Sequence, residues 1–239
     1  MRQQPQILKT GGRQKPEFHR RIVLPKLREA IFTGYFKPGE PISRARINEL
    51  FRSSIFTKAT VAEPGRIAIR EALIVLENEG LVHIVPHVGT LVRVLSTGEK
   101  EEIQNVRRVL EEHVAVTLAA MPSVSLGGVS EINSRMRRIA EKRNRHDNDI
   151  LKFAELDDQF HRSLAEAAGY PTTIARFLAD LRKRLRLVVL PSAESFAGDT
   201  VSEHGEILSA IRGGDKAKVQ RAVAKHLQCA MRRWDSRVG

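Results

Sequence analysis

The chain has 239 residues, a hydrophobic content of 41% and a formal net charge of +12. This length can supply two modest domains with buried cores, and the composition is typical of a globular protein. No apolar run is long enough to cross a bilayer, the first residues lack the apolar core of a secretory signal, and Cys229 has no second cysteine to pair with. We therefore expect a cytoplasmic protein without a membrane span.

The positive charge is concentrated in the first part of the chain. Residues 1–95 hold 16 Lys and Arg against 8 Asp and Glu, whereas residues 96–239 hold 24 against 20. Such an excess attracts phosphate groups whatever the base sequence, and it predicts binding that weakens with salt. Charge alone fits DNA, RNA or an acidic membrane surface, but an aromatic content of 5% disfavours RNA binding by base stacking.

The first segments of the chain are predicted to be a tail and a helix. Residues 1–17 combine Pro, Gly and scattered basic residues without periodicity, so we expect a flexible basic tail. Residues 18–33 carry apolar side chains at helical spacing and predict the first helix. This helix should begin or kink near Pro25 and end at Gly34.

A second helix is expected over residues 44–51. A turn at residues 37–39 precedes it, and Ser43 is a plausible N-cap for its first turn. Arg44 and Arg46 lie at the start of this helix, where they are candidates for contact with DNA phosphates.

The stretch GRIAIREALIVLENEGLV, residues 65–82, is typical of an amphipathic helix that Gly80 ends. Arg66 and Arg70 fall outside the apolar side of this helix. That side is predicted to consist of Ile67, Ile69, Leu73, Ile74 and Leu76.

A short hairpin is expected directly after this helix. Residues 81–85 and 90–94 are rich in β-branched side chains and flank the turn PHVG. A helix with arginines near its start, followed by a hairpin, is typical of a winged helix-turn-helix. In that motif the helix enters the major groove and the hairpin tip touches the backbone or the minor groove. An ordinary helix packed on a two-stranded ribbon is the alternative.

The order of residues in this region resembles the DNA-binding domain of the GntR family of bacterial transcription regulators. The likeness lies in PGEPIS from Pro38, in the 65–82 stretch and in the glycine-tipped wing. The residues that match the family pattern are Arg66, Arg70, Glu71, Ala72, Leu73, Leu76, Glu79, Gly80, Leu81 and Val82. The resemblance implies that Arg66 and Arg70 contact guanine edges or phosphates, with Gly65 at the helix start and Gly89 in the wing beside the duplex.

The sequence departs from the family pattern just before the predicted recognition helix, residues 65–82. A helix-turn-helix turn normally has three or four residues, yet residues 52–64 intervene here. This run can lengthen the second helix, loop out or replace the turn. Gly65 also stands where the family has Ser or Thr, which removes a hydroxyl cap and a group that could contact DNA.

The chain after residue 95 is predicted to be all-helical. Ser96 and Glu99 form a capping box for the first of its helices, and glycines and prolines separate the others. The expected helices cover residues 97–120, 128–144, 148–168, 172–190, 200–211 and 216–237. They predict a helical bundle. Basic runs at 135–145 and 182–186 are expected to be solvated helix faces or dimer rims.

Three histidines and an aspartate lie on stripes that should face the interior of this bundle. They are Asp157, His161, His204 and His226. Asp157 and His161 are four residues apart and point the same way. Each histidine alone is typical of a core residue with a backbone partner, but buried imidazoles and a carboxylate together are costly unless paired or ligated. Such a set can surround a divalent ion: Zn²⁺ suits imidazole best, and Ni²⁺, Mn²⁺ or Fe²⁺ fit an octahedral site.

The second domain resembles the ligand-binding domain of the FadR subfamily, the FCD type. The likeness lies in VRRVLEEHVAVTLAA from Val106, in the Asp157-x-x-Phe160-His161 box and in the two later histidines. In that family an Asp and three His hold a metal, and small organic acids bind beside it. The resemblance implies that the metal ligands are Asp157, His161, His204 and His226, with Asp158 as a competing carboxylate. It also implies that Arg107 clamps an effector carboxylate. A solvated Arg107 bonded to Glu111 is the alternative.

The sequence thus predicts a mainly α protein in three parts. These are the tail over 1–17, a winged helix-turn-helix domain over 18–95 and a helical effector-binding and dimerisation domain over 96–239. The predicted function is that of a homodimeric, ligand-responsive transcription repressor on palindromic operator DNA, and not that of an enzyme. The alternative is a metal-dependent hydrolase whose Asp/His cluster activates water. It needs a general base, and no carboxylate other than Asp158 stands out for that role.

Overall fold

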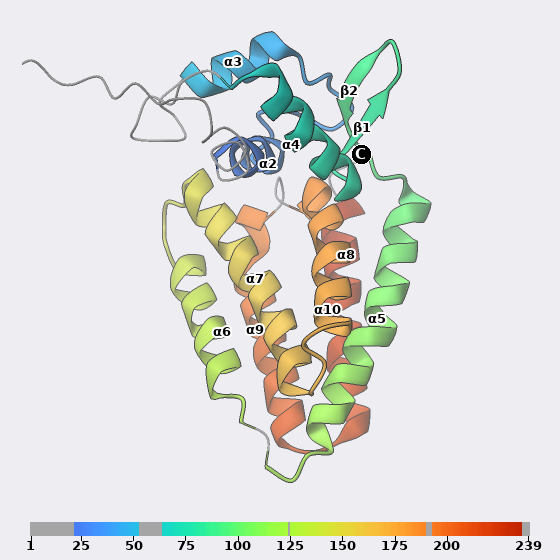
Figure 1. Cartoon of the computed structure of the whole chain (residues 1–239). Helices are drawn as coiled ribbons and strands as arrows, with labels where there is room; N and C mark the ends of the chain where they lie inside the picture. Colours follow the sequence, from blue (N-terminus) through green and yellow to red (C-terminus); the bar gives the residue numbers. More distant parts are fainter. Residues whose placement is uncertain (1–21, 53–63, 124, 190–192, 236–239) are drawn as a thin grey trace, which may run out of the picture. The chain divides into compact units, whose positions relative to one another are not determined.

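The computed structural model of the chain describes residues 22–52, 64–123, 125–189 and 193–235 (Figure 1). They divide into two compact units, with the boundary between Arg93 and Val94; the short segment 32–34 groups with the second unit. The first unit combines helices with one small hairpin, and the second is built from helices. This arrangement confirms the predicted fold class. The predicted tail over 1–17 lies outside the described residues, as does most of the 52–64 run.

The first unit begins with two short helices, α2 (Leu24–Phe32) and α3 (Arg44–Arg52). As expected, α2 begins next to Pro25, and Gly34 follows its end with a left-handed φ of 77°. The hydroxyl of Ser43 accepts a hydrogen bond from the amide of Arg46 at the start of α3, which confirms the predicted cap. The core between these helices includes Leu27, Ile47, Leu50 and Phe51.

The third helix of this unit is α4 (Arg66–Asn78), which corresponds to the predicted recognition helix. Its inward side consists of Ala68, Ile69, Ala72 and Leu76. The expectation that Ile67 and Ile74 are buried is wrong, since they are 73% and 42% exposed. With 3.6 residues per turn, both lie almost opposite the inward positions, which two alanines fill. Gly80 ends the helix at φ 72°, where the amide of Leu81 donates to the carbonyl of Leu76.

A two-stranded antiparallel hairpin follows α4 and forms the wing. Strand β1 (Val82–Val85) pairs with β2 (Gly89–Val92), so that Val82 lies opposite Val92. The amide of Val88 donates to the carbonyl of Val85, and His87 adopts a φ of 62° behind Pro86, as in a type II turn. The carboxylate of Glu77 accepts from the amide of Ile84 at 2.7 Å and so fixes the hairpin to α4.

The residues before α3 pair with strand β2 as a third segment of the wing, which the sequence did not predict. The amide of Ile42 donates to the carbonyl of Thr90 at 2.8 Å, and the amide of Val92 donates to the carbonyl of Glu40 at 2.9 Å. Pro41 and Leu91 form the bridge between these two bonds. The wing is therefore held at its outer strand as well as by α4.

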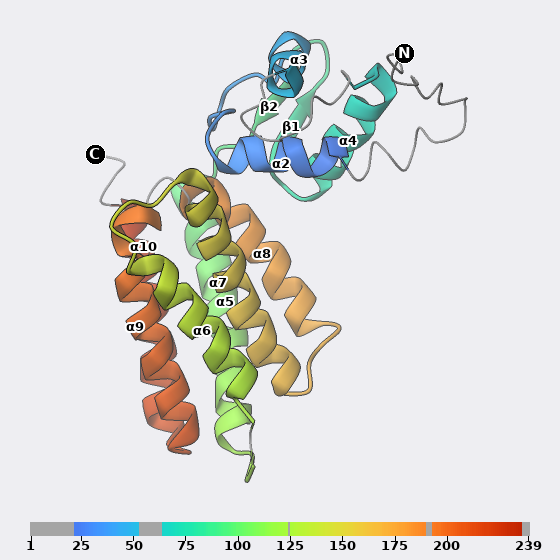
Figure 2. The same cartoon turned by 90° about the vertical axis from the view of Figure 1, so that its left-hand side faces the viewer.

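The second unit is a bundle of six described helices that run side by side along its length (Figures 1 and 2). They are α5 (Thr97–Ala119), α6 (Gly127–Ala140), α7 (Asp147–Ala167), α8 (Ile174–Val189), α9 (Ala193–Arg212) and α10 (Lys216–Asp235). Helix α5 packs against α7, α8, α9 and α10, and α6 packs against α7 and α9. Because α7, α9 and α10 all border the interior along α5, side chains from these helices can meet there.

Helix boundaries in the bundle follow local signals in most places. The capping box of Ser96 and Glu99 is present as predicted at the start of α5. Helix α9 begins at Ala193, seven residues before the expected start, and α6 ends at Ala140, four residues early. Gly198 does not interrupt α9, because glycine inside a helix costs only about 1 kcal/mol and tertiary packing can offset that. None of the described helices combines the length and hydropathy that a bilayer span requires.

Candidate metal centre and DNA-binding surface

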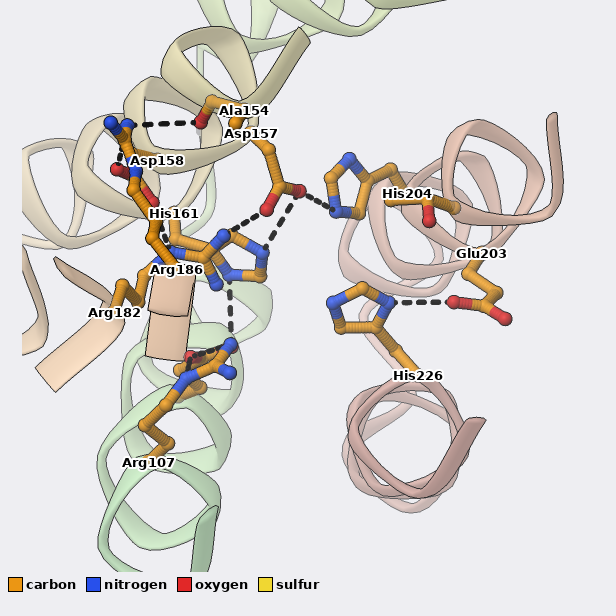
Figure 3. Close-up of polar contacts among 12 residues, drawn as sticks. Arg107, Ala154, Asp157, Asp158, His161, Arg182, Arg186, Glu203, His204 and His226 are labelled. Atoms are coloured by element: carbon orange, nitrogen blue, oxygen red, sulfur yellow. Dashed lines mark hydrogen bonds and ion pairs between the residues drawn. The ribbon is translucent and has the colours of Figure 1, made fainter. Parts of the chain in front are cut away.

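Four side chains predicted as metal ligands meet inside the bundle (Figure 3). His161 comes from α7, His204 from α9 and His226 from α10, and one ring nitrogen of each lies within 4.8 Å of the others. All three imidazoles are buried. Asp157 lies one turn before His161 on α7, and its Oδ1 is 3.3 Å from Nε2 of His204 and 3.9 Å from Nε2 of His161. The arrangement has the geometry of a candidate metal centre.

Several polar atoms at this centre make no hydrogen bond, even where two of them are as close as Oδ1 of Asp157 and Nε2 of His204. They are Oδ1 of Asp157, Nε2 of His161 and both ring nitrogens of His204. A buried polar atom without a partner costs about 1–3 kcal/mol, so a cluster of them is unusual in a core that serves packing alone. A divalent cation would satisfy the atoms that face one another, and imidazole with carboxylate is a donor set that Zn²⁺, Ni²⁺, Mn²⁺ and Fe²⁺ accept. The residues present therefore fit a divalent ion.

Two of the histidines are oriented by carboxylates on their outer nitrogens. Oε2 of Glu111 on α5 lies 2.8 Å from Nδ1 of His161, and Oε2 of Glu203 on α9 lies 2.8 Å from Nδ1 of His226. Such a contact fixes the tautomer with the proton on Nδ1, so that Nε2 keeps its lone pair for a cation. The ring of His204 is instead held by stacking on Phe160, with centroids 3.8 Å apart.

The carboxylates of α7 are fixed by arginines of α8. Arg182 donates to Oδ2 of Asp157 and, at 2.9 Å, to Oδ1 of Asp158, while Arg186 donates to Oδ2 of Asp158. The expectation that the 182–186 run is a solvated face is therefore wrong for Arg182, which is buried, and Arg186, which is largely buried. Asp158 is engaged by both arginines, whereas Asp157 keeps Oδ1 directed at the histidines (Figure 3). This geometry favours Asp157 over Asp158 as a ligand.

Burial and the neighbouring charges keep the imidazoles of His161 and His204 neutral at pH 7. Burial and the neighbouring Arg182 lower the pKa of His161 to about 4, against the opposing effect of Glu111. Burial and His226 hold the pKa of His204 well below its ordinary value. Burial alone would raise the pKa of Asp157, but Arg182 and the histidines outweigh it and lower that pKa. At neutral pH the site thus offers neutral imidazole to a cation beside an ionised carboxylate.

Arg107, the predicted effector clamp, lies inside the bundle beside this centre. Its guanidinium donates to Oε1 of Glu111 at 2.8 Å and to Oε1 of Gln104 at 2.9 Å. The predicted alternative, a bond to Glu111, is present, but the side chain is buried and not solvated. A small cavity of about 10 Å³ lies next to Glu111 and His161, with otherwise apolar walls. The role of Arg107 toward an effector stays a prediction.

The sequence prediction did not place three charged side chains at the candidate centre: Glu111, Arg182 and Glu203. Glu111 could have been found, because it lies on the same helical stripe as the buried Val114 and Leu118. Arg182 and Glu203 carry no comparable signal. A charged residue in a basic run, or one next to a histidine in sequence, does not reveal that a neighbouring helix supplies its partner.

The residues predicted to contact DNA lie on the surface of the first unit. Arg44, Arg66 and Arg70 are exposed, and so are Gly65 and Gly89 (φ 122°). Gly65 is the N-cap of α4 and makes no side-chain cap, as its replacement of Ser or Thr implies.

Arg46 differs from the other candidates. It donates to the carboxylate of Glu40 and to the carbonyl of Tyr35, and its guanidinium lies over the Tyr35 ring. Its side chain therefore ties α3 to the segment before it. A contact between Arg46 and phosphate stays a prediction.

Comparison with known proteins assigns both units to one class. Residues 102–228 match the model of the FCD domain. The transcriptional repressor RspR of Escherichia coli K12 is 30% identical over 209 residues, covering 84% of this chain and 82% of that protein. A transcriptional regulator from an unstable DNA locus of Streptomyces ambofaciens is 29% identical over 226 residues, covering 93% and 86%. A GntR-type regulator from Rhodococcus superposes with a TM-score of 0.70 at 22% identity, covering 92% and 99%.

A winged helix-turn-helix unit followed by an FCD bundle defines a DNA-binding transcription regulator. The chain belongs to the GntR family, in its FadR-type subfamily with an FCD domain. Its relatives regulate transcription and are not enzymes, so the expectation of a non-enzymatic function is confirmed and the hydrolase alternative is set aside.

Proposed function

We propose that this regulator holds one divalent metal ion in its bundle and changes its affinity for operator DNA when a small organic acid binds beside that ion. The observation that carries the metal proposal is the meeting of unpartnered ligand atoms from Asp157, His161 and His204. The carboxylates behind His161 and His226 support it, because they orient Nε2 toward the centre. When bound, the ion would supply a cationic anchor for the acid.

The balance of charges around the centre supports an anionic effector. The carboxylates there are Glu111, Asp157, Asp158 and Glu203, and the guanidinium groups that bond to them are Arg107, Arg182, Arg186 and Arg233. These charges cancel while the imidazoles are neutral. A divalent ion would leave two uncompensated positive charges in a buried site, which is costly. A carboxylate ligand would offset this excess of positive charge. The cavity beside His161 and Glu111 is where the acid would enter, and at about 10 Å³ it requires the helices of the bundle to move apart.

The DNA-binding part of the proposal rests on the surface of α4. Arg66 and Arg70 are exposed at the start of this helix, and Arg44 is exposed at the start of α3. Arginine can bind guanine edges bidentately or neutralise phosphates. A homodimer would present two such helices to the half-sites of a palindromic operator, one helical turn apart. Repression, as the name of RspR states for that protein, and a cytoplasmic location belong to the same proposal.

The proposal is tested by duplex binding in three states of the protein. A duplex is first selected from a random-sequence pool, and its affinity is then measured for metal-free protein, for metal-loaded protein, and for metal-loaded protein with acetate, lactate, malate or citrate. We expect at least one acid to change the affinity about five- to 150-fold, and only in metal-loaded protein. His226→Ala should abolish the response while duplex binding persists. Equal affinities in all states would contradict the proposal.

A further inference from the structure

The start of α4 exposes an isoleucine that the fold does not use. Ile67 is 73% exposed, more than any other large apolar side chain in the described residues. Burying an isoleucine side chain normally stabilises a protein, but the fold leaves Ile67 in contact with solvent. The inward positions of the same helix are filled by Ala68, Ile69, Ala72 and Leu76. Ile67 is therefore free to contact something outside the chain.

The surroundings of Ile67 fit a nucleic-acid surface. Arg66 precedes it and Arg70 lies one turn further on the same exposed side, while Glu71, also exposed, is the one acidic residue in the first two turns of α4. Gly65 caps the helix, and a Cβ placed there would meet nothing within 4 Å, so a surface can come close to the helix start. The helix N-terminus adds partial positive charge. An acidic partner surface is thus favoured around an apolar side chain.

In the major groove of DNA, one feature matches an isoleucine. Thymine presents its C5 methyl group there, whereas the other three bases present only hydrogen-bond donors and acceptors that an aliphatic side chain cannot satisfy. We propose that Ile67 packs on the C5 methyl group of a thymine and so selects thymine at one position of each half-site. This inference rests on the proposed binding of DNA through α4. It assigns base selection to Ile67, while the flanking arginines supply affinity.

Replacing thymine by deoxyuridine removes that methyl group and leaves the hydrogen-bonding groups intact, so it tests the contact directly. In a duplex selected from a random pool by the wild-type protein, each thymine is replaced in turn. We expect one replacement per half-site to weaken wild-type binding about fourfold, the factor for one buried methyl group. Ile67→Ala should bind the thymine and deoxyuridine duplexes equally. Because Ile67 is exposed, the thermal unfolding of the Ile67→Ala variant should match that of the wild type.

Ile74→Ala is the matched control, since it makes the same truncation on the same exposed side, two turns further along α4. It should keep the fourfold preference for thymine. Tight wild-type binding that is insensitive to every replacement would overturn the inference and leave the proposed function intact. A preference that survives in Ile67→Ala, or a loss of the dimer in that variant, would also overturn it. Failure of the wild type to bind any selected duplex would reject DNA binding through α4 itself.

Discussion

Glu111 of α5 and His161 of α7 are joined by a 2.8 Å contact between Oε2 and Nδ1 inside the bundle. The two helices are distant in sequence, and neither side chain is exposed. Burial alone would raise the pKa of Glu111, but Arg107 and His161 hold it well below its ordinary value, so the carboxylate is ionised and accepts the Nδ1 proton. The pair therefore orients a proposed metal ligand from a helix that supplies no ligand itself.

Glu111→Gln should weaken metal binding about 10- to 100-fold, the usual cost of losing a partner of a ligating histidine. The amide keeps the size of the side chain but removes the charge that fixes the His161 tautomer. Competition titration against a chromophoric chelator measures the affinity. Glu101→Gln, an exposed position on the same helix, serves as control and should leave it unchanged. Equal affinity in both variants would show that Glu111 does not position His161.

Arg182→Met should destabilise the metal-free protein by about 3–5 kcal/mol, because it leaves Asp157 and Asp158 without their shared cation in a largely buried site. Adding a divalent metal should restore part of this loss, since the ion places positive charge beside Asp157. Urea unfolding with and without metal measures both effects. A variant as stable as the wild type, or one that gains no more from metal than the wild type does, would contradict the role given to Arg182.

The pair Arg28 and Glu79 should hold α2 to α4. It is bidentate, with bonds of 2.9 and 2.7 Å, and both side chains are largely buried. Glu79→Ala should cost about 1 kcal/mol locally, which corresponds to roughly fivefold faster amide exchange in α2 and α4. The control is Glu131→Ala, which breaks an exposed ion pair with Arg138 and should change exchange little. Equal effects of both variants would show that burial adds nothing to the first pair.

Gly65→Ser should strengthen the start of α4. The backbone at Gly65 has φ −65° and ψ 160°, which any residue adopts, and the added Cβ meets nothing within 4 Å. A serine hydroxyl can accept from the amide of Ile67 or Ala68, for a gain of a few tenths of a kcal/mol over glycine. Hydrogen exchange at these two amides should slow. Faster exchange there would mean that the helix start differs from the one described.

Local signals were enough to predict the helices and the hairpin. The capping box at Ser96 and the stop at Gly80 depend only on neighbouring residues, and both appear as expected. The apolar character of a residue predicted its burial less reliably than its position around the helix did, since Ile67 and Ile74 are apolar yet exposed. The third segment of the wing at Glu40–Ile42 was not predictable, because it depends on backbone pairing between segments about 50 residues apart.

The candidate centre was predictable only in its innermost part. Asp157 and His161 share a helical stripe, so their spacing already places them together. Their partners Glu111 and Arg182 come from α5 and α8, and only helix packing brings those helices next to α7. Charge balance in the bundle is therefore a property of the fold and cannot be derived from the sequence of one helix.

The most direct test is the metal content of the purified protein after loading and removal of free ions. Plasma mass spectrometry should find about one divalent ion per chain in the wild type. His161→Ala and His226→Ala should both lose most of it. His113→Ala, a histidine variant on the exposed side of α5, should retain the full content. A wild type without bound metal, or unchanged content in both cluster variants, would contradict the metal centre.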